Sequence, residues 1–549
     1  MYITQMRIQN YRNFKDLSMT FHPLANYLVG ENDIGKSSFL RLVSFVTRAR
    51  NVDEIEYDDP RQPIRIDLEI RLLEGKKEHF ADTPDDHRQT IRVRLEMRVS
   101  DIVPRLYDLD TGEALPLETI RRLRYVSYSA LSQEDARMRP QVYRALERWL
   151  AQWEASHCGP IPREERQYIQ HEVNVGPFDS SYYECIFYLS RILCRSNRHR
   201  ADNLKFISLA ALRVITQIYQ MAHSLAVPLE HNIIVDKDGR QYLPLIISID
   251  EPEIHLHPYM QRSILEYYQQ LLRNEDAQFC ALLKDLFGLD GLRGQLFVVT
   301  HSTDSLIDDY RNIVRLYRNP RGQVRAACGS SFQVKREIEK HLIMHFPEVK
   351  EALYARSVIL VEGETEFGCF QLFGQKVGVP FDYYGICLIN ARGESSIAKI
   401  KKLLEYFQLP VVALYDADVK EAHAKEKGVF FTQGICFEQD LAQTMLLKGK
   451  RQALDRIINS ACGTIGRTSA DMIKRACHKL QLDPQDFPPG PLCKARTHNG
   501  APLWVPYFAW LYSNKGVILG RLIGQSLERQ EVPPAFAKVI KKAGRLATV

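Results

Sequence analysis

The sequence has few of the features that mark membrane-spanning, secreted or zinc-ribbon proteins. No segment approaches the roughly 18 uncharged apolar residues that a membrane span requires. Residues 1–10 alternate polar and apolar side chains like a strand and lack the basic-then-apolar build of a signal peptide. The 11 cysteines form no CxxC pair and no CxxC…HxxxH arrangement, so neither a redox dithiol nor a zinc ribbon is indicated. We therefore expect a protein of the reducing cytoplasm with no membrane partner.

A large excess of charge of one sign is missing as well. The chain has 73 basic and 67 acidic residues, and this slight basic balance is compatible with a polyanionic partner without identifying nucleic acid. Internal repeats and low-complexity tracts are also missing, and 45% hydrophobic residues are typical of a folded protein. A chain of 549 residues exceeds what one hydrophobic core organises, so we expect two or more domains.

The first part of the chain shows two kinds of strand and one helical region. Strict alternation over residues 64–72 and 91–97 predicts an antiparallel, half-exposed sheet. Nearly continuous apolar runs over residues 243–249 and 295–300 predict strands buried on both faces of a parallel sheet. Residues 133–222 are helical and charged in pattern, and we expect them to form an inserted arm.

A second α/β series follows a break in the chain pattern. A stretch with proline and glycine over residues 318–329, followed by a polar helical segment over 333–355, predicts the domain boundary. Apolar runs at 357–361, 386–389 and 411–415 are each followed by a helical pattern. We therefore divide the chain into a first domain over 1–330, a linker over 331–355, and a second domain over 356–549 with helical, basic C-terminal elements.

A glycine loop that ends in lysine and serine lies between a strand and a helix. Residues 30–37 match GxxxxGK[ST], the apolar strand 25–29 precedes them, and an apolar helix follows. In such a loop the amides face phosphates, Lys36 neutralises the outer phosphate oxygens, and the Ser37 hydroxyl can bind Mg²⁺. The flanking elements favour an ATP site over a chance glycine loop. Further contacts to the nucleotide are expected from Asn32, Gly35 and Ser38.

Two acids end the buried strand at residues 245–249. Asp250 is expected to hold Mg²⁺ through water, and Glu251 to polarise the water that attacks the γ-phosphate. His301 follows the next apolar strand, where a histidine can sense the γ-phosphate. A lone histidine after a strand usually has no role in binding. A role for His301 is therefore supported only by the neighbouring motifs, which are the phosphate loop and the two acids.

Four motifs together resemble the SMC/RecF-type ABC ATPases and occur in that family's order. They are Tyr11-Arg12-Asn13-Phe14, the phosphate loop, the run from Asp250-Glu251-Pro252-Glu253 to Pro258, and Thr300-His301-Ser302. The resemblance implies ATP sites that close between two protomers, where the partner supplies a serine and glycines from a signature loop. The best match is Ser208, which lacks the glycines, so we expect ATP binding with slow turnover. An ordinary helix-start serine is an equal alternative.

A second set of acids follows two later strands. The strand at 357–361 leads to Glu362, with Glu366 four residues on, and the strand at 411–415 leads to Asp416 and Asp418 at alternate positions. Carboxylates this close repel one another unless cations neutralise them, and such oxygen ligands suit Mg²⁺ or Mn²⁺. The alternative to a metal site is that these acids are ordinary solvated side chains at the ends of strands.

The strand-Glu-Gly and strand-Asp-x-Asp patterns resemble Toprim domains, and an ABC ATPase followed by Toprim is the layout of the OLD (overcoming lysogenisation defect) family. The resemblance implies an α/β chain: an ABC-type P-loop ATPase with a helical insertion, then a parallel-sheet Toprim nuclease domain and a helical C-terminal region. It also implies two-metal phosphodiester hydrolysis, with Glu362, Glu366, Asp416 and Asp418 as ligands. Lys515 would stabilise the transition state, unless it is a surface lysine. Glu438 and Asp440 would add metal ligands, unless they are helix-start acids.

Two functions remain open from the sequence. The first is a nucleotide-regulated, metal-dependent DNA endonuclease with an antiphage role, and the second is an ATP-dependent DNA-binding clamp or sensor without nuclease activity. The intact acids favour the first, and no topoisomerase-type DNA-gate domain with a nucleophilic tyrosine is found. The resemblance implies DNA, a second copy of the chain (a dimer or a dimer of dimers), and a helicase or a retron reverse transcriptase with its DNA as partners. Basic runs at 474–479 and 538–545 would follow a phosphate backbone or form solvated helix faces.

Overall fold

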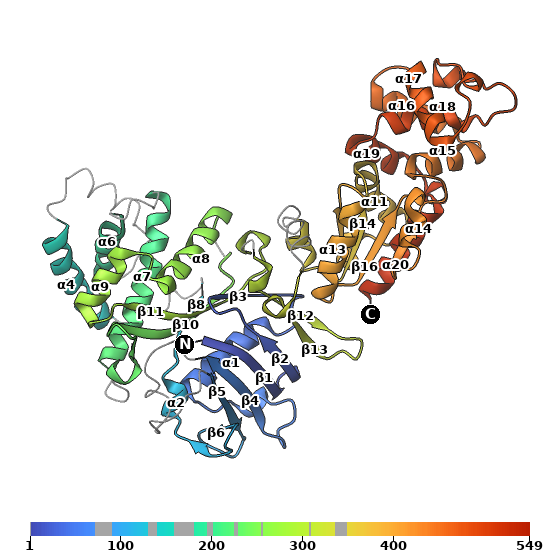
Figure 1. Cartoon of the computed structure of the whole chain (residues 1–549). Coiled ribbons are helices and arrows are strands. Elements are labelled where there is room, and N and C mark those ends of the chain that lie inside the picture. The colour runs from blue at the N-terminus through green and yellow to red at the C-terminus, as the bar shows by residue number, and fades with distance from the viewer. Residues whose placement is uncertain are drawn as a thin grey trace. The chain divides into compact units, whose positions relative to one another are not determined.

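The computed structural model describes residues 2–71, 90–129, 140–158, 180–194, 201–223, 229–253, 256–306, 309–334 and 348–548. The chain separates into two compact units, Met1–Phe332 and Gln333–Val549 (Figure 1). Within the described ranges, no helix has the length and apolar character that crossing a membrane requires.

An antiparallel sheet of six strands forms one layer of the first unit, in the order β2-β1-β4-β5-β6-β7. Along β4 the side chains of Ile64, Ile66, Leu68 and Ile70 are buried and alternate with more exposed polar ones, which confirms the expected half-exposed sheet. The strands are β1 (Tyr2–Tyr11), β2 (Phe14–Thr20), β4 (Ile64–Arg71), β5 (Thr90–Met97), β6 (Arg105–Asp108) and β7 (Ala114–Leu115).

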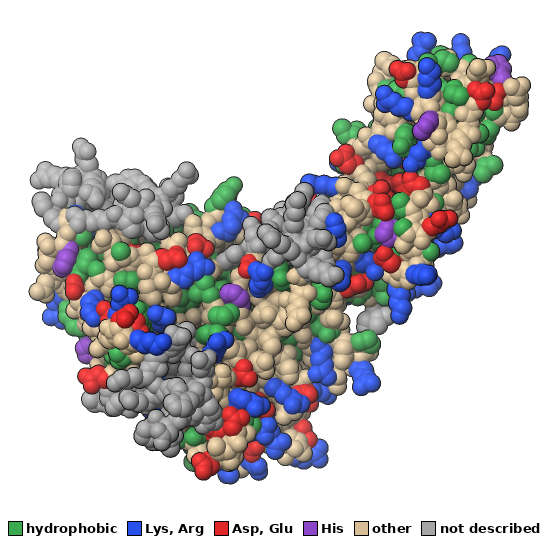
Figure 2. All heavy atoms as spheres, in the orientation of Figure 1, with side chains coloured by type: hydrophobic (Ala, Val, Ile, Leu, Met, Phe, Trp, Pro, Cys, Tyr) green, Lys and Arg blue, Asp and Glu red, His purple; other side chains and the backbone are tan. Residues whose placement is uncertain are grey.

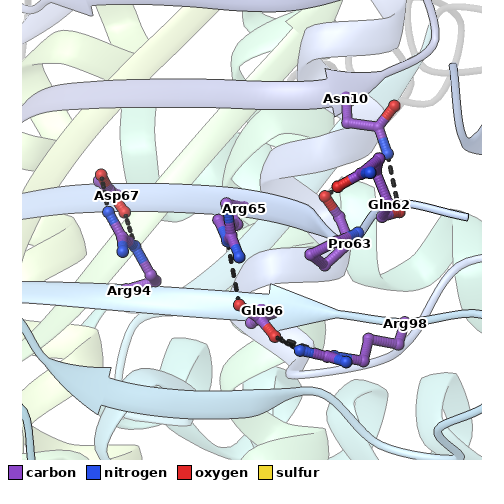
Figure 3. Close-up of polar contacts among 8 residues, drawn as sticks. All are labelled: Asn10, Gln62, Pro63, Arg65, Asp67, Arg94, Glu96 and Arg98. Atoms are coloured by element: carbon purple, nitrogen blue, oxygen red, sulfur yellow. Dashed lines mark hydrogen bonds and ion pairs between the residues drawn. The ribbon is translucent and has the colours of Figure 1, made fainter. Parts of the chain in front are cut away.

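Ion pairs between neighbouring strands cover the polar face of this sheet (Figure 3). Asp67 and Arg94 are direct cross-strand partners, and Arg94 Nε lies 2.6 Å from Asp67 Oδ1. Glu96 accepts from both Arg65, at 3.1 Å, and Arg98, at 2.9 Å. Such half-exposed pairs each contribute about 0.2–1 kcal/mol, so they fix register more than they stabilise the fold.

A second, seven-stranded sheet carries the nucleotide-binding elements, in the order β13-β12-β3-β11-β10-β8, with β9 paired to β10. Strands β12, β3, β11, β10 and β8 run parallel, and β10 and β11 are almost wholly buried, as their apolar runs predicted. The strands are β3 (Ala25–Val29), β8 (Arg124–Ser129), β9 (Ile234–Val235), β10 (Gln241–Asp250), β11 (Gly291–Val299), β12 (Ile313–Arg318) and β13 (Val324–Cys328).

The proline- and glycine-containing stretch at 318–329 lies at the end of the first unit, just before the division between Phe332 and Gln333. It forms an antiparallel hairpin of β12 and β13 at the edge of the parallel sheet, and Gly322 in its turn has φ 72°. Glycine adopts this left-handed conformation without steric cost, so the turn residues signal a hairpin as readily as a linker. Of the segment expected to be helical over 333–355, residues 335–347 lie outside the described ranges and 348–352 are helical.

Helices pack on the parallel sheet of the first unit, where α1 contacts β8, β10 and β11, and α8 and α9 contact β11. In the segment expected to form a helical arm, α4, α6 and α7 pack on one another, and Trp153 Nε1 on α4 donates to Asp285 Oδ2 on α9 at 2.7 Å. The helices are α1 (Lys36–Arg48), α2 (Glu118–Arg121), α4 (Pro140–His157), α6 (Ser180–Cys194), α7 (Ala201–Ala222), α8 (Pro258–Arg273) and α9 (Ala277–Phe287), with 3₁₀ turns η1 (Glu54–Glu56), η3 (Leu229–Asn232), η4 (Thr303–Ser305), η5 (Tyr310–Asn312) and η6 (Gly329–Ser331).

The second unit is built on a four-stranded, all-parallel sheet in the order β15-β14-β16-β17. Its strands are β14 (Ser357–Val361), β15 (Ile386–Asn390), β16 (Val411–Tyr415) and β17 (Val429–Phe431). Its helices are α11 (Glu364–Val377), α12 (Phe381–Tyr384), α13 (Glu394–Tyr406), α14 (Lys420–His423), α15 (Phe437–Leu447), α16 (Arg451–Cys462), α17 (Ala470–Leu480), α18 (Trp504–Ser513), α19 (Val517–Ser526) and α20 (Pro534–Ala547), with 3₁₀ turns η7 (Ala417–Val419), η8 (Pro484–Asp486), η9 (Leu492–Lys494) and η10 (Arg529–Glu531). The expected fold class is confirmed.

Aromatic and glycine contacts join the helices of this unit to its sheet. The rings of Phe370 on α11 and Phe437 on α15 lie 4.9 and 4.7 Å from that of Phe536 on α20. Helices α11 and α19 touch through their backbones, since a Cβ added at Gly520 would lie 2.1 Å from the Thr365 carbonyl oxygen. This close approach holds the loop before α19 beside the first turn of α11.

Candidate functional site

A cavity of about 870 Å³ lies at the end of the parallel sheet in the first unit. Strand β3 ends at Val29, the glycine loop follows, and α1 begins at Lys36, as the motif predicted. The lining includes most of the residues expected to bind nucleotide. These are Asn32, Gly35, Lys36, Ser37, Ser38, Glu251 and His301, together with Arg12, Asn13, Asp33 and Glu253.

Lys36 is held inside the loop by the loop's own backbone. Its Nζ lies 2.9 Å from the Gly30 carbonyl oxygen and 2.7 Å from that of Glu31. Burial lowers the pKa of Lys36 to about 8, although the nearby acids oppose this shift. Gly35 has φ 109°, and a Cβ there would lie 2.7 Å from the Phe14 ring, so the tight loop requires glycine. A phosphate offered to Lys36 would replace carbonyl contacts with a charge-assisted bond.

Asp250 is the last residue of β10 and Glu251 follows it; Glu251 lines the cavity, whereas Asp250 contacts the lining residue Ser37. Asp250 Oδ1 accepts from the Ser37 hydroxyl at 3.2 Å, and burial raises the pKa of Asp250. Glu251 adopts φ 52°, a left-handed conformation that is strained for a glutamate, and its backbone N–H donates to the Val299 carbonyl at 2.9 Å. This kink turns Glu251 toward His301, with 3.7 Å between Oε1 and Nε2. Asp250 and Ser37 thus form a pair suited to Mg²⁺.

Glu253 and Arg12 also line the cavity. Both belong to the motifs named above, but the sequence alone gives neither residue a role. Glu253 accepts from the Thr300 hydroxyl at 2.8 Å and from the His301 backbone N–H at 2.5 Å. Arg12 donates to Glu56, which is 1% exposed, and its Nη1 lies 2.9 Å from Ser38 Oγ. Burial lowers the pKa of His301, and the charge of Lys36 adds to that effect. These contacts fix the loops around the cavity.

Ser208 does not fit the signature-loop role. It lies inside α7, which begins seven residues earlier at Ala201, and its side chain is fully buried. Its hydroxyl lies 2.9 Å from that of Ser190 on α6. A serine that meets the nucleotide of a second protomer must be exposed, so this arrangement corrects the expectation for Ser208.

The acids of the second unit gather at the carboxyl edge of its sheet. Glu362 directly follows β14 and Asp416 directly follows β16, and these two strands are neighbours. Glu366 lies in the first turn of α11 and is 5% exposed. A Cβ added at Gly363 would lie 2.6 Å from Glu366 Oε2, so the glycine after Glu362 leaves room for the second carboxylate. Three of the four predicted acids are thus brought together.

A buried acid and a lysine from the helical region complete this cluster. Glu438, in the first turn of α15, has no exposed surface. Lys515, in the loop between α18 and α19, lies 2.9 Å from Glu438 Oε2 and 4.8 Å from the centre of the Tyr512 ring. Although burial opposes it, the charge of Glu438 raises the pKa of Lys515. Lys515 therefore contacts the acid cluster, and 40% of its side chain is exposed to solvent.

Burial and mutual repulsion raise the pKa of several of these carboxyl groups. Burial raises the pKa of Asp416 to about 8, and the charge of Glu366 adds to the shift. Burial, followed by the charge of Glu438, also raises the pKa of Glu366. The pKa of Glu362 is raised chiefly by burial. Acids whose pKa is raised in this way favour the binding of a cation, which would take the place of their protons.

Asp418 and Asp440 depart from the expected arrangement. Strand β16 ends at Tyr415, so Asp418 lies in the turn η7 rather than on the strand, and its Oδ2 is 2.7 Å from Lys479 Nζ on α17. Both oxygens of Asp440 accept backbone N–H groups, from Gln433 at 2.8 Å and Gly434 at 2.5 Å. Asp440 thereby stabilises the loop before α15, which is a structural role. The sequence places Lys479 only within a basic run and does not signal this contact.

The cluster has the chemistry of a divalent-cation site. Glu362 Oε2 and Glu438 Oε1 are buried without a hydrogen-bond partner, which is costly for a carboxylate and would be relieved by a cation. Within the described part of the chain, no three His, Cys, Asp or Glu side chains already converge on one metal position. Side-chain rotation would therefore accompany binding. Oxygen donors alone favour Mg²⁺ or Mn²⁺ over softer metals.

Family comparisons agree with this division of the chain. Residues 353–418 match the family described as "Overcoming lysogenization defect protein-like, TOPRIM domain", and residues 1–99 and 214–305 match the AAA ATPase domain. The DNA replication and repair protein RecF of Bacillus cytotoxicus is 28% identical over 76 residues, which are 14% of this chain and 20% of RecF. RecF of Lactococcus lactis subsp. cremoris is 35% identical over 51 residues, 9% of this chain and 14% of RecF. The chain thus spans a fifth or less of the length of these relatives.

Two of the solved structures similar to parts of this chain are a C-terminal region of an OLD protein and an SMC head. The C-terminal region of the Xanthomonas campestris pv. campestris OLD protein has 17% identity and a TM-score of 0.25, covering 36% of this chain and 96% of that one. An SMC head bound to the C-winged helix domain of ScpA has 10% identity and a TM-score of 0.33, covering 59% of this chain and 97% of that one.

Proposed function

We propose that this chain, which joins an AAA ATPase domain to an OLD-like Toprim domain, is a metal-dependent DNA endonuclease controlled by bound ATP. The observation that carries the proposal is a cluster of four acids at one sheet edge with Lys515 beside it, in which Glu366 and Glu438 are buried and Glu362 and Asp416 are partly buried. Unpaired buried carboxylates are costly for folding, so their presence at one sheet edge favours a catalytic role over a structural one.

The cluster offers each group that phosphodiester hydrolysis needs. Glu362, Glu366, Asp416 and Glu438 would hold Mg²⁺ or Mn²⁺, joined by Asp418 after it leaves Lys479. Two such cations, when bound, would activate water and neutralise the leaving oxygen. Lys515 keeps its charge because Glu438 raises its pKa, and its amine would donate to the scissile phosphate as negative charge develops there.

The nucleotide cavity supports binding and slow hydrolysis of ATP. Lys36 would neutralise phosphate oxygens, Asp250 with Ser37 would hold Mg²⁺, and Glu251 would orient the attacking water. With Ser208 buried, any signature contact from a second protomer has to come from another residue. We infer that bound ATP acts as a signal that controls cleavage.

DNA and a second copy of the chain are the partners that we propose. The RecF relatives are proteins of DNA replication and repair by name, which supports DNA as the substrate. The composite ATP site that the family resemblance implies supports a homodimer or a dimer of dimers. On the family resemblance alone we add an antiphage role and a helicase or a retron reverse transcriptase as a further partner.

Cleavage of supercoiled plasmid by the purified chain tests this function. We expect nicked or linear products with Mg²⁺ and none with EDTA or in Asp416→Ala. Asp382→Ala, which removes an exposed acid of the same unit, is the matched control and should cleave normally. Products that persist in Asp416→Ala would assign the cleavage to a contaminant or to another site.

A DNA-binding clamp without nuclease activity is the second candidate. Two observations favour it: Asp418 is tied to Lys479, and no three potential ligands converge within the described residues. On this function the chain would bind DNA in an ATP-dependent way and leave the plasmid intact at every Mg²⁺ and Mn²⁺ concentration.

A further inference from the structure

Helix α17 presents a basic face beside the Toprim acids. Its apolar side chains Ile473, Ala476 and Cys477 are buried, and the helix packs on α18. The opposite face exposes four basic side chains: Lys474, Arg475, His478 and Lys479. Lys, Arg and His side chains are visible on this helical part of the second unit in Figure 2.

One residue of this face reaches the site itself. Lys479 Nζ lies 2.7 Å from Asp418 Oδ2, and Asp418 is close enough to the cluster to raise the pKa of Glu362. Arg475 precedes Lys479 by four residues, so the two side chains are neighbours along one row of the helix. Lys474 and His478 form a second row with the same spacing. The basic face therefore extends from the edge of the acidic cluster outward along α17.

The other basic run of this unit lies elsewhere. Lys541, Lys542 and Arg545 are exposed on α20. The end of α20 at Ala543 is fixed to Ser357, whose hydroxyl donates to the Ala543 carbonyl at 3.0 Å. Ser357 is the first residue of β14, whereas the acids follow the last residue of that strand. The basic end of α20 is therefore at the opposite edge of the sheet from the acids.

We propose that α17 docks the phosphate backbone of DNA, and that Lys479 guides the strand from this helix to the Toprim acids. The inference rests on the proposed nuclease function and adds where the substrate binds. An acidic cluster repels a polyanion, so a DNA path to it requires cations close by, and α17 is the basic run that meets this condition. Each phosphate neutralised by Lys or Arg releases counterions, which makes the docking strongly salt-dependent.

Binding of a fluorescent DNA duplex to the full chain, measured by anisotropy over a series of salt concentrations, tests the proposal. Lys474→Ala/Arg475→Ala should weaken binding roughly tenfold or more near 0.1 M salt and reduce the slope of log K against log salt by about 2. Lys541→Ala/Lys542→Ala removes the same charge from α20 and should leave both quantities unchanged. Measurements in EDTA, and with Mg²⁺ on an Asp416→Asn background, keep cleavage from interfering.

A variant of Lys479 provides a second test, because Mn²⁺ affinity would not change if Lys479 only added surface charge. In Lys479→Gln the Asp418 carboxylate is released, so Mn²⁺ binding without DNA should tighten several-fold while DNA binding weakens. Unchanged Mn²⁺ affinity would overturn the guiding role of Lys479. Circular dichroism verifies that each variant is folded, and the substituted side chains are at least partly exposed.

The results separate this inference from the proposed function. If the chain cleaves plasmid while the α17 double variant binds DNA like wild type, the inference alone is wrong. Equal losses in the α17 and α20 variants would also overturn it, as would a wild-type chain that binds no DNA. If binding depends on α17 but Mg²⁺ never produces cleavage, the docking surface is correct and the nuclease function is wrong.

Discussion

Lys515 Nζ lies 2.9 Å from Oε2 of Glu438, a carboxylate with no exposed surface. The two residues come from the loop after α18 and the first turn of α15, so the ion pair ties both ends of the helical region to the sheet edge. A buried charge that loses its partner is strongly destabilising, whereas removing both charges is often nearly neutral. The difference in stability between single and double variants therefore tests whether the two residues form an ion pair.

Lys515→Met should reduce DNA cleavage by about two to three orders of magnitude, the usual loss when one donor to the developing charge is removed. It should also destabilise the metal-free chain by about 1–3 kcal/mol, less than for a fully buried pair because Lys515 is 40% exposed. Plasmid cleavage and thermal denaturation measure the two effects. Adding Glu438→Gln should restore stability without restoring cleavage, and the exposed Lys402→Met is the matched control. A double variant as unstable as the single one would contradict the pairing.

The metal-free chain should become less stable as pH rises toward 8. Burial raises the pKa of Asp416 to about 8, and that of Glu366 is raised as well, so the folded state holds protons that the unfolded state releases near pH 4. Because the folded state binds more protons between these values, its stability falls as pH rises through this window. Thermal denaturation in EDTA from pH 5 to 8.5 measures the trend. Asp416→Asn should flatten it, and Mg²⁺ should restore stability at pH 8; a stability that rises over this range would refute the assignment.

Much of both sites could be predicted because their motifs are local. A strand that ends at Val29, a glycine loop and a helix that begins at Lys36 leave little freedom for the phosphate loop. The same holds for Glu362 and Asp416 at the ends of buried strands. Their positions follow from chain direction within a parallel sheet.

Other contacts could not be predicted because they depend on tertiary packing. Lys479 reaches Asp418 from 61 residues further along the chain, and no local pattern signals that approach. Glu438 and Asp440 look equivalent in sequence, yet one faces the cluster and the other binds backbone amides. The burial of Ser208 could not be predicted either, because it depends on the packing of α7 against α6.

Lys36→Ala should abolish ATP binding, because it removes the charge that neutralises the phosphates and the amine that organises the loop. Glu251→Gln should retain binding and lose hydrolysis. Binding is followed with a fluorescent ATP analogue and hydrolysis by phosphate release. Wild-type turnover in Glu251→Gln would remove this residue from the catalytic role, and strong binding in Lys36→Ala would place the nucleotide elsewhere.

The chain should form at least a dimer in solution, because ATP sites of this type close between two protomers. Multi-angle light scattering at micromolar concentration, with and without ATP, measures the mass. A single monomeric species under both conditions would contradict the composite site. Ser208→Ala should leave both mass and ATP turnover unchanged, since that side chain is buried against Ser190.

ATP should regulate DNA cleavage without powering it. Phosphodiester hydrolysis is already downhill and requires positioned cations and water, which the second unit can supply from its own residues. The nucleotide cavity belongs to the first unit, so its occupancy can act on cleavage only by shifting the chain between arrangements that differ in access to the acids. Coupling of this kind typically amounts to about 1–3 kcal/mol, which corresponds to a change of several-fold to about a hundredfold in activity.

Cleavage by Glu251→Gln should therefore persist and should respond to a non-hydrolysable ATP analogue as it does to ATP. Glu362→Ala and Asp416→Ala should abolish cleavage whatever nucleotide is bound, because they act on the acids themselves. Plasmid cleavage with ATP, with the analogue and without nucleotide measures these effects on matched samples. If cleavage required continuous ATP turnover, and the analogue reproduced no effect of ATP, the ATPase would have to drive a mechanical step. In that case Glu251→Gln would lose cleavage together with hydrolysis, although its Toprim acids are intact.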